Sequence, residues 1–351
     1  MIIAVNTGFK GDGHAADEFI YSCLVHLSEK NPAHQFIYFF TVSFDRISFF
    51  PKNVTAVISG PEPKAALLKQ YHLNYKIPAL LKKYKADALL NMNGICAGRT
   101  KVPQCLFIID HVIKKQMASS LEKAKVIVTA SSTTKQVIID QYPISEVKID
   151  IITPAIEEIF RPLTYQEKEV IKEKYAEGKE FFLAHSNNNL LNLLKAFSFF
   201  KKRQKSNMML LISGKTGGQF KQEMKTFKFR NEVRLLENLS NEEQAKITAA
   251  AYAMVYPVLY DSLATIPLQA MTCKVPVLCS HTGALPEICG DAALYFDLAD
   301  FKDIAEKMML VFKDEDGAKE LVKAGETLSQ HYDWDKTSGL LWQSILKAID
   351  N

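Results

Sequence analysis

One segment in the second half of the chain carries residues suited to binding an anion and hydroxyl groups. An apolar strand at 253–257 leads into a loop with one acid, Asp261, and a helix follows in which Gln269 lies eight positions after that acid. A carboxylate accepts hydrogen bonds from hydroxyl groups, and a carboxamide offers one acceptor oxygen and two donors. The helix begins with free N–H groups and the positive end of its dipole, which favour an anion such as phosphate. A second apolar strand at 275–279 completes a βαβ unit, so these loops are expected at the carboxyl ends of parallel strands, where open α/β sheets bind ligands.

The same segment resembles the donor-site motif of family 4 of the retaining glycosyltransferases. That pattern reads P-S-x-x-E-G-F-G-L-P-x-x-E-A-M-A-x-G-x-P-V, followed by G-x-x-P-E and G-D-A-A. Asp261 stands at its first acid and Gln269 at its second. The rest of the register is carried by Ala270-Met271, Lys274 to Val277, Gly283 to Glu287 and Gly290 to Ala293. Two acids are therefore replaced by Asp and Gln, and three glycines by Ser262, Ala264 and Lys274.

The resemblance implies a GT-B fold and transfer of a sugar from a nucleotide diphosphate sugar. It implies that Asp261 reaches hydroxyls of the transferred sugar, although its side chain is one methylene shorter than Glu. Gln269 would hold the ribose of the nucleotide through its single acceptor oxygen. Backbone N–H groups near the start of the helix would serve the sugar and the phosphate, and these belong to Leu263, Ala264 and Thr265.

A second segment, His185 to Phe197, resembles the family's H-P-R-K-N-L-x-N-L-L-K-A-F, in which Arg and Lys hold the donor diphosphate. The register puts Asn187 at the Arg and Asn188 at the Lys. A hydrogen bond to a charged group contributes roughly 1.5–3 kcal/mol against about 1 kcal/mol for a neutral one, so the two losses amount to about 1–4 kcal/mol. Lys215, after an apolar strand, and Lys10 are candidate replacements. The alternative role for the asparagines is capping the helix that follows.

Two loops of the first half complete the candidate site. Gly11 and Gly13 lie between the first strand and the first helix, where glycines let the backbone approach a phosphate. In the resemblance this loop borders the acceptor and the donor diphosphate; the alternative is a tight turn with no ligand. Asp110 follows an apolar strand at the place where the family carries His-Asp, and His111 comes one position late. Asp110 therefore either lines the cleft or caps a helix.

Composition limits the class of protein. The 351 residues suffice for two domains, and a hydrophobic content of 48% with 23% charged residues is typical of a globular protein. A net charge of +4 does not indicate a nucleic-acid partner. Two basic clusters, Lys82 to Lys85 and Lys201 to Lys205, are either solvated helix ends or a weak attachment to an anionic membrane surface.

Targeting and cysteine usage predict a cytoplasmic protein and leave open a place at the inner face of the membrane. The six cysteines form no CxxC pair, so buried thiols are expected rather than a metal site or disulfides. Met1 leads directly into an apolar strand without the features of a signal peptide. No apolar run approaches the ~20 residues that a membrane span needs.

Strands and helices alternate along both halves, which predicts α/β folding with parallel, doubly wound sheets. The first Rossmann-like domain is expected over 1–160 and the second, which binds the nucleotide sugar, over 161–334. A polar stretch, Glu157 to Lys179, is interpreted as the interdomain connection. The last helix, 335–351, is expected to pack back on the first domain, as the resemblance implies.

The predicted function is transfer of a hexose from a nucleotide diphosphate sugar to a glycan or lipid-linked acceptor, with retention of configuration. The resemblance implies no bound metal and no cofactor, with the nucleotide sugar as co-substrate. Because the reaction needs charge neutralised on the departing phosphate, electrostatic preorganisation should outweigh acid–base work. The alternative is a catalytically silent GT-B scaffold or binding protein in a polysaccharide-assembly system.

Overall fold

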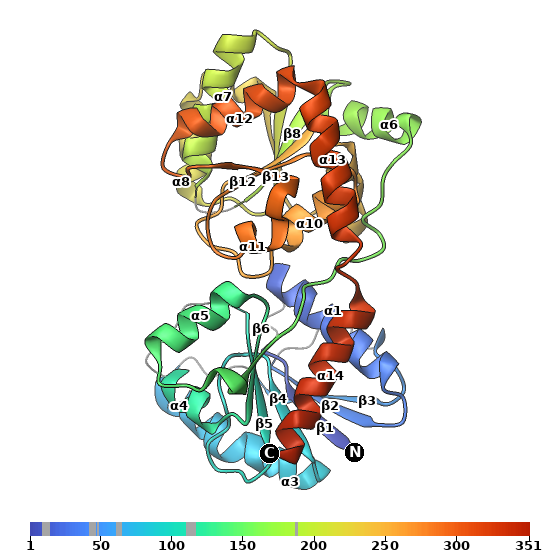
Figure 1. Ribbon diagram of the computed structural model, residues 1–351, viewed down its shortest axis with the longest axis vertical. Coiled ribbons are helices and arrows are strands. Elements are labelled where there is room, and N and C mark those ends of the chain that lie inside the picture. Colours follow the sequence, from blue (N-terminus) through green and yellow to red (C-terminus); the bar gives the residue numbers. More distant parts are fainter. Residues whose placement is uncertain (9–14, 42–46, 48, 61–64, 110–116, 187–188) are drawn as a thin grey trace. The chain divides into compact units, whose positions relative to one another are not determined.

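The computed structural model describes residues 1–8, 15–41, 47, 49–60, 65–109, 117–186 and 189–351. The chain divides into two compact units, 1–154 together with 333–351, and 155–332 (Figure 1). The sequence placed these boundaries at 160/161 and 334/335. Each unit is built around its own parallel sheet with helices on both faces (Figure 1).

The N-terminal unit contains a sheet in the order β3-β2-β1-β4-β5-β6-β7, with parallel pairing throughout. The strands are β1 (Ile2–Asn6), β2 (Gln35–Phe40), β3 (Val54–Ile58), β4 (Ala88–Asn91), β5 (Gln104–Ile108), β6 (Val126–Thr129) and β7 (Ile149–Ile151). The central strands β1, β4, β5 and β6 are almost wholly buried, as expected for a parallel sheet covered on both faces. The edge strand β3 is only partly buried, although four of its five residues are β-branched.

The helices of this unit are α1 (Ala15–Lys30), α2 (Ala66–Tyr71), α3 (Ile77–Tyr84), α4 (Met117–Lys123), α5 (Ser132–Gln141) and α14 (Trp334–Asp350). A π-helical turn, His72–Lys76, joins α2 to α3. The helical segment from α2 to α3 is therefore continuous but changes its hydrogen-bonding pattern in the middle. A 3₁₀ turn, Glu146–Lys148, leads into β7.

Helix α14 returns to the N-terminal unit from the far end of the sequence (Figure 1). Leu341 and Ile345 on its inner face are completely buried. The ring of Trp334 stacks on His26 with the centroids 4.9 Å apart, and Lys347 Nζ lies 2.6 Å from Asp150 Oδ1. Apolar burial and these polar contacts together attach the helix to its unit.

The C-terminal unit contains a sheet in the order β10-β9-β8-β11-β12-β13, also parallel. Its strands are β8 (Phe181–His185), β9 (Met209–Ser213), β10 (Val233–Leu236), β11 (Ala253–Tyr256), β12 (Val277–Ser280) and β13 (Ala293–Phe296). Neighbouring residues of β8 face opposite layers, because Phe181 packs in one apolar core and Phe182 in the other. The order corresponds to 3-2-1-4-5-6 within the unit, the arrangement of Rossmann domains.

The helices of the C-terminal unit are α6 (Tyr165–Ala176), α7 (Leu190–Gln204), α8 (Gly218–Thr226), α9 (Asn241–Ala250), α10 (Thr265–Thr272), α11 (Leu285–Cys289), α12 (Phe301–Lys313) and α13 (Glu315–Ser329). Two 3₁₀ turns, Arg230–Glu232 and Gly290–Ala292, lie between them.

Helix α6 corrects one interpretation made from the sequence. The polar stretch Glu157 to Lys179 was expected to be an interdomain connection, but most of it is helical and belongs to the C-terminal unit. A capping box starts the helix: the Thr164 hydroxyl accepts from the Glu167 amide, and the Glu167 carboxylate accepts from the Thr164 amide. Ile171 and Tyr175 reach the core from an otherwise polar helix, and this narrow apolar face explains why the pattern was missed.

Candidate functional site

The candidate site lies where the strand order of the C-terminal sheet reverses, between β8 and β11. At such a switch point the loops after the two strands diverge and leave a crevice outside their carboxyl ends. The loop after β8 begins with Ser186, and the loop after β11 runs from Pro257 to Ala264. Helix α10 follows the second loop, so its N-terminus is carried to the same edge of the sheet.

Asp261 uses its carboxylate to organise the loop that precedes α10. Its Oδ1 atom accepts hydrogen bonds from the amides of Leu263, at 2.9 Å, and Ala264, at 3.0 Å. Its Oδ2 atom accepts one from the hydroxyl of Tyr256, at 2.9 Å. The acid predicted to contact the sugar therefore makes two hydrogen bonds within its own loop and one to the last residue of β11.

Tyr256 is a site residue that sequence reasoning missed. It is the last residue of β11, and its ring is buried. Burial raises the pKa of its hydroxyl well above the ordinary value, and the neighbouring Asp261 carboxylate raises it further. Tyr256 therefore stays protonated and donates to Asp261. The only sequence signal was a polar aromatic residue at the end of a buried strand.

The loop after β12 braces the Asp261 loop from the other side. The Ala284 amide donates to the Asp261 carbonyl at 2.8 Å. Gly283, with φ of +59°, lies so close that a Cβ atom would come within 2.5 Å of that carbonyl oxygen. The hydroxyls of Ser280 and Thr282 both donate to the Val258 carbonyl, at 2.6 and 2.9 Å. The glycine of the G-x-x-P-E turn thus permits a close approach between two loops.

The start of α10 offers two amides to a ligand. The Leu263 and Ala264 N–H groups are occupied by Asp261, and Pro267 has none. In the described part of the chain, no acceptor contacts the N–H groups of Thr265 and Ile266, the first two residues of the helix. Of the three predicted backbone donors, Thr265 is therefore available, whereas Leu263 and Ala264 already have an intramolecular acceptor.

Two of the three residues that stand in place of motif glycines have a positive φ, the backbone conformation that favours glycine. Ala264 has φ of +50° and Lys274 has φ of +59°, both in the left-handed region that favours glycine. Ser262, at the third replaced glycine, does not have a positive φ. An L-residue in the left-handed region costs about 1–2 kcal/mol, so the surrounding contacts must hold these two positions in place.

Gln269 lies one turn along α10 and is half-buried. Within the residues that the structure describes, its carboxamide makes no hydrogen bond, so both the acceptor oxygen and the donor nitrogen remain for a ligand. The placement is compatible with the predicted contact to a ribose hydroxyl.

Lys215 lies beside the β8 loop. The Ser186 amide donates to the Ser213 carbonyl at 2.7 Å, and the Ser186 hydroxyl donates to the Lys215 carbonyl at 2.8 Å. Lys215 itself is exposed, and among the described residues no carboxylate pairs with it. Ser186 is a second residue that sequence reasoning missed, and it joins the carboxyl ends of β8 and β9.

Glu237, the residue after β10, contacts the loop after β9 that contains Lys215. Its carboxylate accepts from the Thr216 amide at 3.3 Å and pairs with Lys221 Nζ at 2.7 Å. The Lys221 contact, followed by the Thr216 amide, lowers the pKa of Glu237. Lys221 is thus neutralised locally, which leaves Lys215 as the neighbouring cation without a partner in the described part.

Six predicted site residues lie outside the described residues: Gly11, Gly13, Asp110, His111, Asn187 and Asn188. Lys10, a candidate replacement cation, lies outside them too. Their predicted roles remain predictions.

The described residues form no candidate metal site, and the cysteine thiols are buried. Across the described ranges, no group of three or more His, Cys, Asp or Glu side chains could hold a metal ion. The six cysteines, all within the described residues, are buried and form no disulfide. Burial raises the pKa of Cys96 and Cys273 to about 12, which keeps these two thiols protonated. No described helix is both long and apolar enough to cross a membrane.

Comparison with known proteins finds a family model that matches most of the C-terminal unit. Residues 171–328 match the model of the family described as Glycosyl transferases group 1. The chain is 25% identical over 231 residues to O-antigen chain mannosyltransferase B of Escherichia coli; the match covers 64% of this chain and 61% of that protein. The chain thus spans less than two thirds of that relative's length.

Solved structures share the fold over nearly the whole chain. A glycosyltransferase from Rickettsia africae ESF-5 aligns with a TM-score of 0.80 at 16% identity, covering 100% of this chain and 98% of that one. Anabaena Alr3699/HepE in complex with UDP and glucose aligns with a TM-score of 0.76 at 12% identity, covering 98% and 99%. The expected pair of Rossmann-like sheets is confirmed. Residues 171–328 are therefore similar to the glycosyl transferases group 1 family, and the chain has the GT-B fold seen in these solved structures.

Proposed function

We propose that the protein transfers a hexose from a nucleotide diphosphate sugar to a glycan or lipid-linked acceptor, with retention of configuration and without a metal or a cofactor. The observation that carries this proposal is the first turn of α10 beside a Rossmann switch point, where the Thr265 and Ile266 amides have no acceptor among the residues that the structure describes. In a group 1 glycosyltransferase unit, this is the place where a diphosphate gains most from N–H groups and the helix dipole.

Lys215 supplies the cation that the proposal needs. Asn187 and Asn188 stand where the resemblance expects Arg and Lys, so the departing diphosphate requires a positive charge from elsewhere. Lys215 is exposed, lacks a carboxylate partner in the described part, and its backbone is fixed by Ser186. We assign it to the diphosphate, with Gln269 on the ribose.

The reaction breaks the bond between the anomeric carbon and the diphosphate oxygen and forms a bond to the acceptor oxygen on the same face. The acceptor hydroxyl loses its proton, and the departing diphosphate oxygen is the base that takes it. The charge that builds up on the diphosphate is stabilised by the α10 amides and Lys215, which are fixed before the reaction begins. Asp261 holds the loop that places those amides.

The relatives suggest which sugars to test first. The Escherichia coli relative is named an O-antigen chain mannosyltransferase, and HepE was solved with UDP and glucose. We therefore propose mannose or glucose as the transferred hexose. We place the reaction in the cytoplasm, with weak peripheral attachment to a membrane that carries the acceptor, and with no nucleic-acid partner.

Titration calorimetry with UDP, GDP and their sugars tests the proposal. We expect one nucleotide diphosphate to bind with a Kd of about 100 µM or lower, equivalent to roughly −5.5 kcal/mol. Lys215→Gln should weaken that binding about tenfold or more, since it removes a charged contact. Lys225→Gln, an exposed lysine of α8, is the matched control and should leave the affinity unchanged. If no nucleotide binds, the proposal is wrong.

One observation favours a second candidate, a catalytically silent GT-B scaffold in a polysaccharide-assembly system. The Asp261 carboxylate accepts from two amides of its own loop and from the Tyr256 hydroxyl of β11 rather than being left for a sugar. A scaffold of this kind would bind nucleotide sugar without releasing nucleoside diphosphate when acceptors are added. Product release measured with mannosylated and glucosylated acceptors separates the two candidates.

A further inference from the structure

A surface separate from the candidate functional site lies in the N-terminal unit, around α3 and the loop before β5. Residues 65–104 contain seven Lys or Arg residues and a single acid, Asp87. The Asp87 carboxylate accepts a hydrogen bond from the Ile2 amide at 2.7 Å. The one negative charge of this segment is therefore engaged with the backbone.

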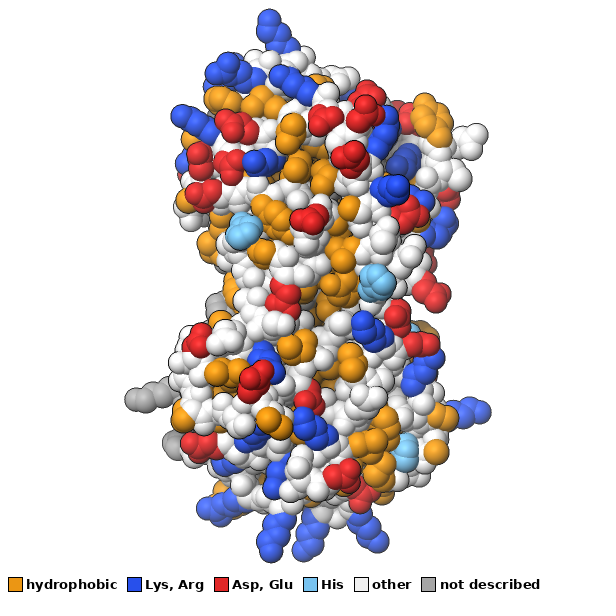
Figure 2. All heavy atoms as spheres, in the orientation of Figure 1, with side chains coloured by type: hydrophobic (Ala, Val, Ile, Leu, Met, Phe, Trp, Pro, Cys, Tyr) orange, Lys and Arg blue, Asp and Glu red, His pale blue; other side chains and the backbone are white. Residues whose placement is uncertain are grey.

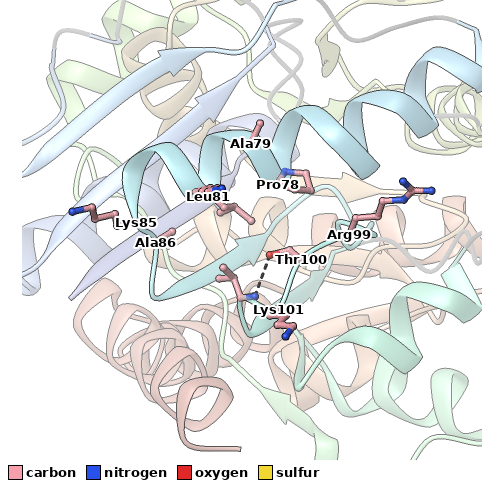
Figure 3. A pocket seen from close by; sticks show the side chains of 10 residues that line it. Pro78, Ala79, Leu81, Lys85, Ala86, Arg99, Thr100 and Lys101 are labelled. Atoms are coloured by element: carbon pink, nitrogen blue, oxygen red, sulfur yellow. Dashed lines mark hydrogen bonds between the residues drawn. The ribbon is translucent and has the colours of Figure 1, made fainter.

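A pocket of about 580 Å³ opens in this segment, and we call it the basic pocket (Figure 3). One wall is α3 with the residues that follow it, and the other is the loop that leads to β5. Because Ala86 precedes β4 and Val102 precedes β5, the pocket lies at the amino ends of the strands. It is lined by Pro78, Ala79, Leu81, Lys82, Lys85, Ala86, Arg99, Thr100, Lys101 and Val102.

The cations of the basic pocket stand on its rim. Figure 3 shows Lys85 and Arg99 on opposite sides, with Lys101 extending away from both. In the part of the chain that the structure describes, no carboxylate lies within salt-bridge distance of them or of Lys82. Figure 2 shows Lys and Arg side chains projecting from the end of this unit where α3 lies. Cations that diverge in this way fit an extended negative surface better than a single small anion.

Aromatic side chains continue the same face. Tyr71 and Tyr75 stack with their ring centroids 5.3 Å apart, and they are 60% and 46% exposed. The guanidinium of Arg99, on the pocket rim, lies 4.5 Å from the Tyr75 ring centroid. Leu68, on α2, is 56% exposed. Exposed tyrosine next to lysine and arginine is the composition of a segment that lies at a membrane–water interface.

We propose that the basic pocket, together with Tyr71, Tyr75 and Leu68, docks on an anionic phospholipid surface. Phosphate headgroups contact the rim cations, and the tyrosines and the leucine enter the headgroup region. This inference rests on the proposed function for its purpose, because a lipid-linked acceptor would be presented at such a surface. It goes further by assigning the contact to one face, at the amino ends of β4 and β5.

Sedimentation with vesicles tests the assignment. We expect the full chain to bind phosphatidylcholine vesicles that contain phosphatidylglycerol, to bind pure phosphatidylcholine much less, and to dissociate as salt is raised. The triple variant Lys82→Gln, Lys85→Gln, Lys101→Gln should bind about 100-fold more weakly, since each cation near an anionic surface contributes about fivefold.

A matched triple variant controls for net charge. Lys202→Gln, Arg203→Gln, Lys205→Gln changes the other basic cluster, at the end of α7, by the same amount. It should bind vesicles like the wild type, apart from a small effect of total charge. Equal losses in both triple variants, or no vesicle binding by the wild type, would overturn the assignment. Tyr71→Ser should weaken vesicle binding without changing the charge.

Two further measurements separate the remaining outcomes. If the wild type binds inorganic pyrophosphate saturably and the variant Lys82→Gln, Lys85→Gln, Lys101→Gln loses that binding, the basic pocket is a site for a soluble anion. This result would overturn the membrane assignment. Without vesicles, the variant Lys82→Gln, Lys85→Gln, Lys101→Gln should bind nucleotides with the same affinity as the wild type. If nucleotides bind to neither, while the vesicle results hold, the proposed function fails and the docking surface stands.

Discussion

At the scale of single residues, the hydrogen bonds of Asp261 show what its carboxylate does in the candidate site. Its carboxylate accepts from Tyr256, Leu263 and Ala264, which fixes the turn before α10 without capping the helix itself. We expect Asp261→Ala to lower the free energy of unfolding by roughly 2–3 kcal/mol, since three donors lose their acceptor. Tyr256→Phe should cost about 1–2 kcal/mol and leave nucleotide affinity unchanged.

Urea denaturation of both variants, with nucleotide titration beside it, checks this prediction. Ser262→Ala, in the same loop, serves as a substitution that keeps the carboxylate. Should Asp261→Ala keep its full stability yet abolish transfer, the carboxylate would act on the substrate, as the sequence resemblance implies.

At the scale of elements, the Glu243 carboxylate of α9 connects this helix to α6. Its protonation at acid pH should lower the stability of the fold. Glu243 accepts from the Tyr175 hydroxyl at 2.8 Å, from Lys174 at 3.2 Å, and from the Ser240 amide at 3.3 Å in the capping box of α9. The Tyr175 contact first, then the Ser240 amide and Lys174, lower the pKa of Glu243 to about 2. A lowered pKa in the folded state stabilises the protein above the unfolded pKa, and the contribution disappears as the group is protonated.

The stability contributed by Glu243 should therefore be complete above pH 4.5, the ordinary value, and be lost as the pH falls toward about 2. Glu243→Gln should show a smaller loss of unfolding midpoint over this interval than the wild type. Glu242→Gln, its exposed neighbour, should follow the wild-type curve. Thermal denaturation at a series of pH values makes the comparison, and parallel curves for Glu243→Gln and the wild type would contradict it.

At the scale of the whole molecule, the chain completes its N-terminal unit with its last helix. Leu341 is completely buried on the inner face of α14, which packs on α1 and on the central strands. Leu341→Ala should lower the stability of that unit by about 2–5 kcal/mol through a lost side chain and a cavity. Gln343→Ala, exposed on the same helix, should have little effect. Urea titration followed by circular dichroism measures both, and equal midpoints would show that α14 adds little.

Much of the architecture could be predicted from local patterns. Apolar runs such as those of β4, β6 and β11, separated by amphipathic helices, indicate parallel sheets because a strand buried on both faces must be apolar throughout. Local patterns failed where burial is partial. Strand β3 is half-exposed at a sheet edge, and α6 is polar on most of its surface, so neither shows a clear periodicity.

The sequence by itself determined the alternation of strands and helices, the register of the donor-site motif and the place of Gln269 on α10. The tertiary structure decided which of the motif's groups remain free. Tyr256, Ser280 and Gly283 come from strand ends and loops that meet only when β11 and β12 pair. Hydrogen-bond partners depend on that spatial meeting, and spacing along the chain carries no record of it. Asp261 differs from these residues, because the described partners of its carboxylate all lie within five positions of it. The resemblance makes it a sugar ligand, whereas in the fold its carboxylate fixes the turn before α10.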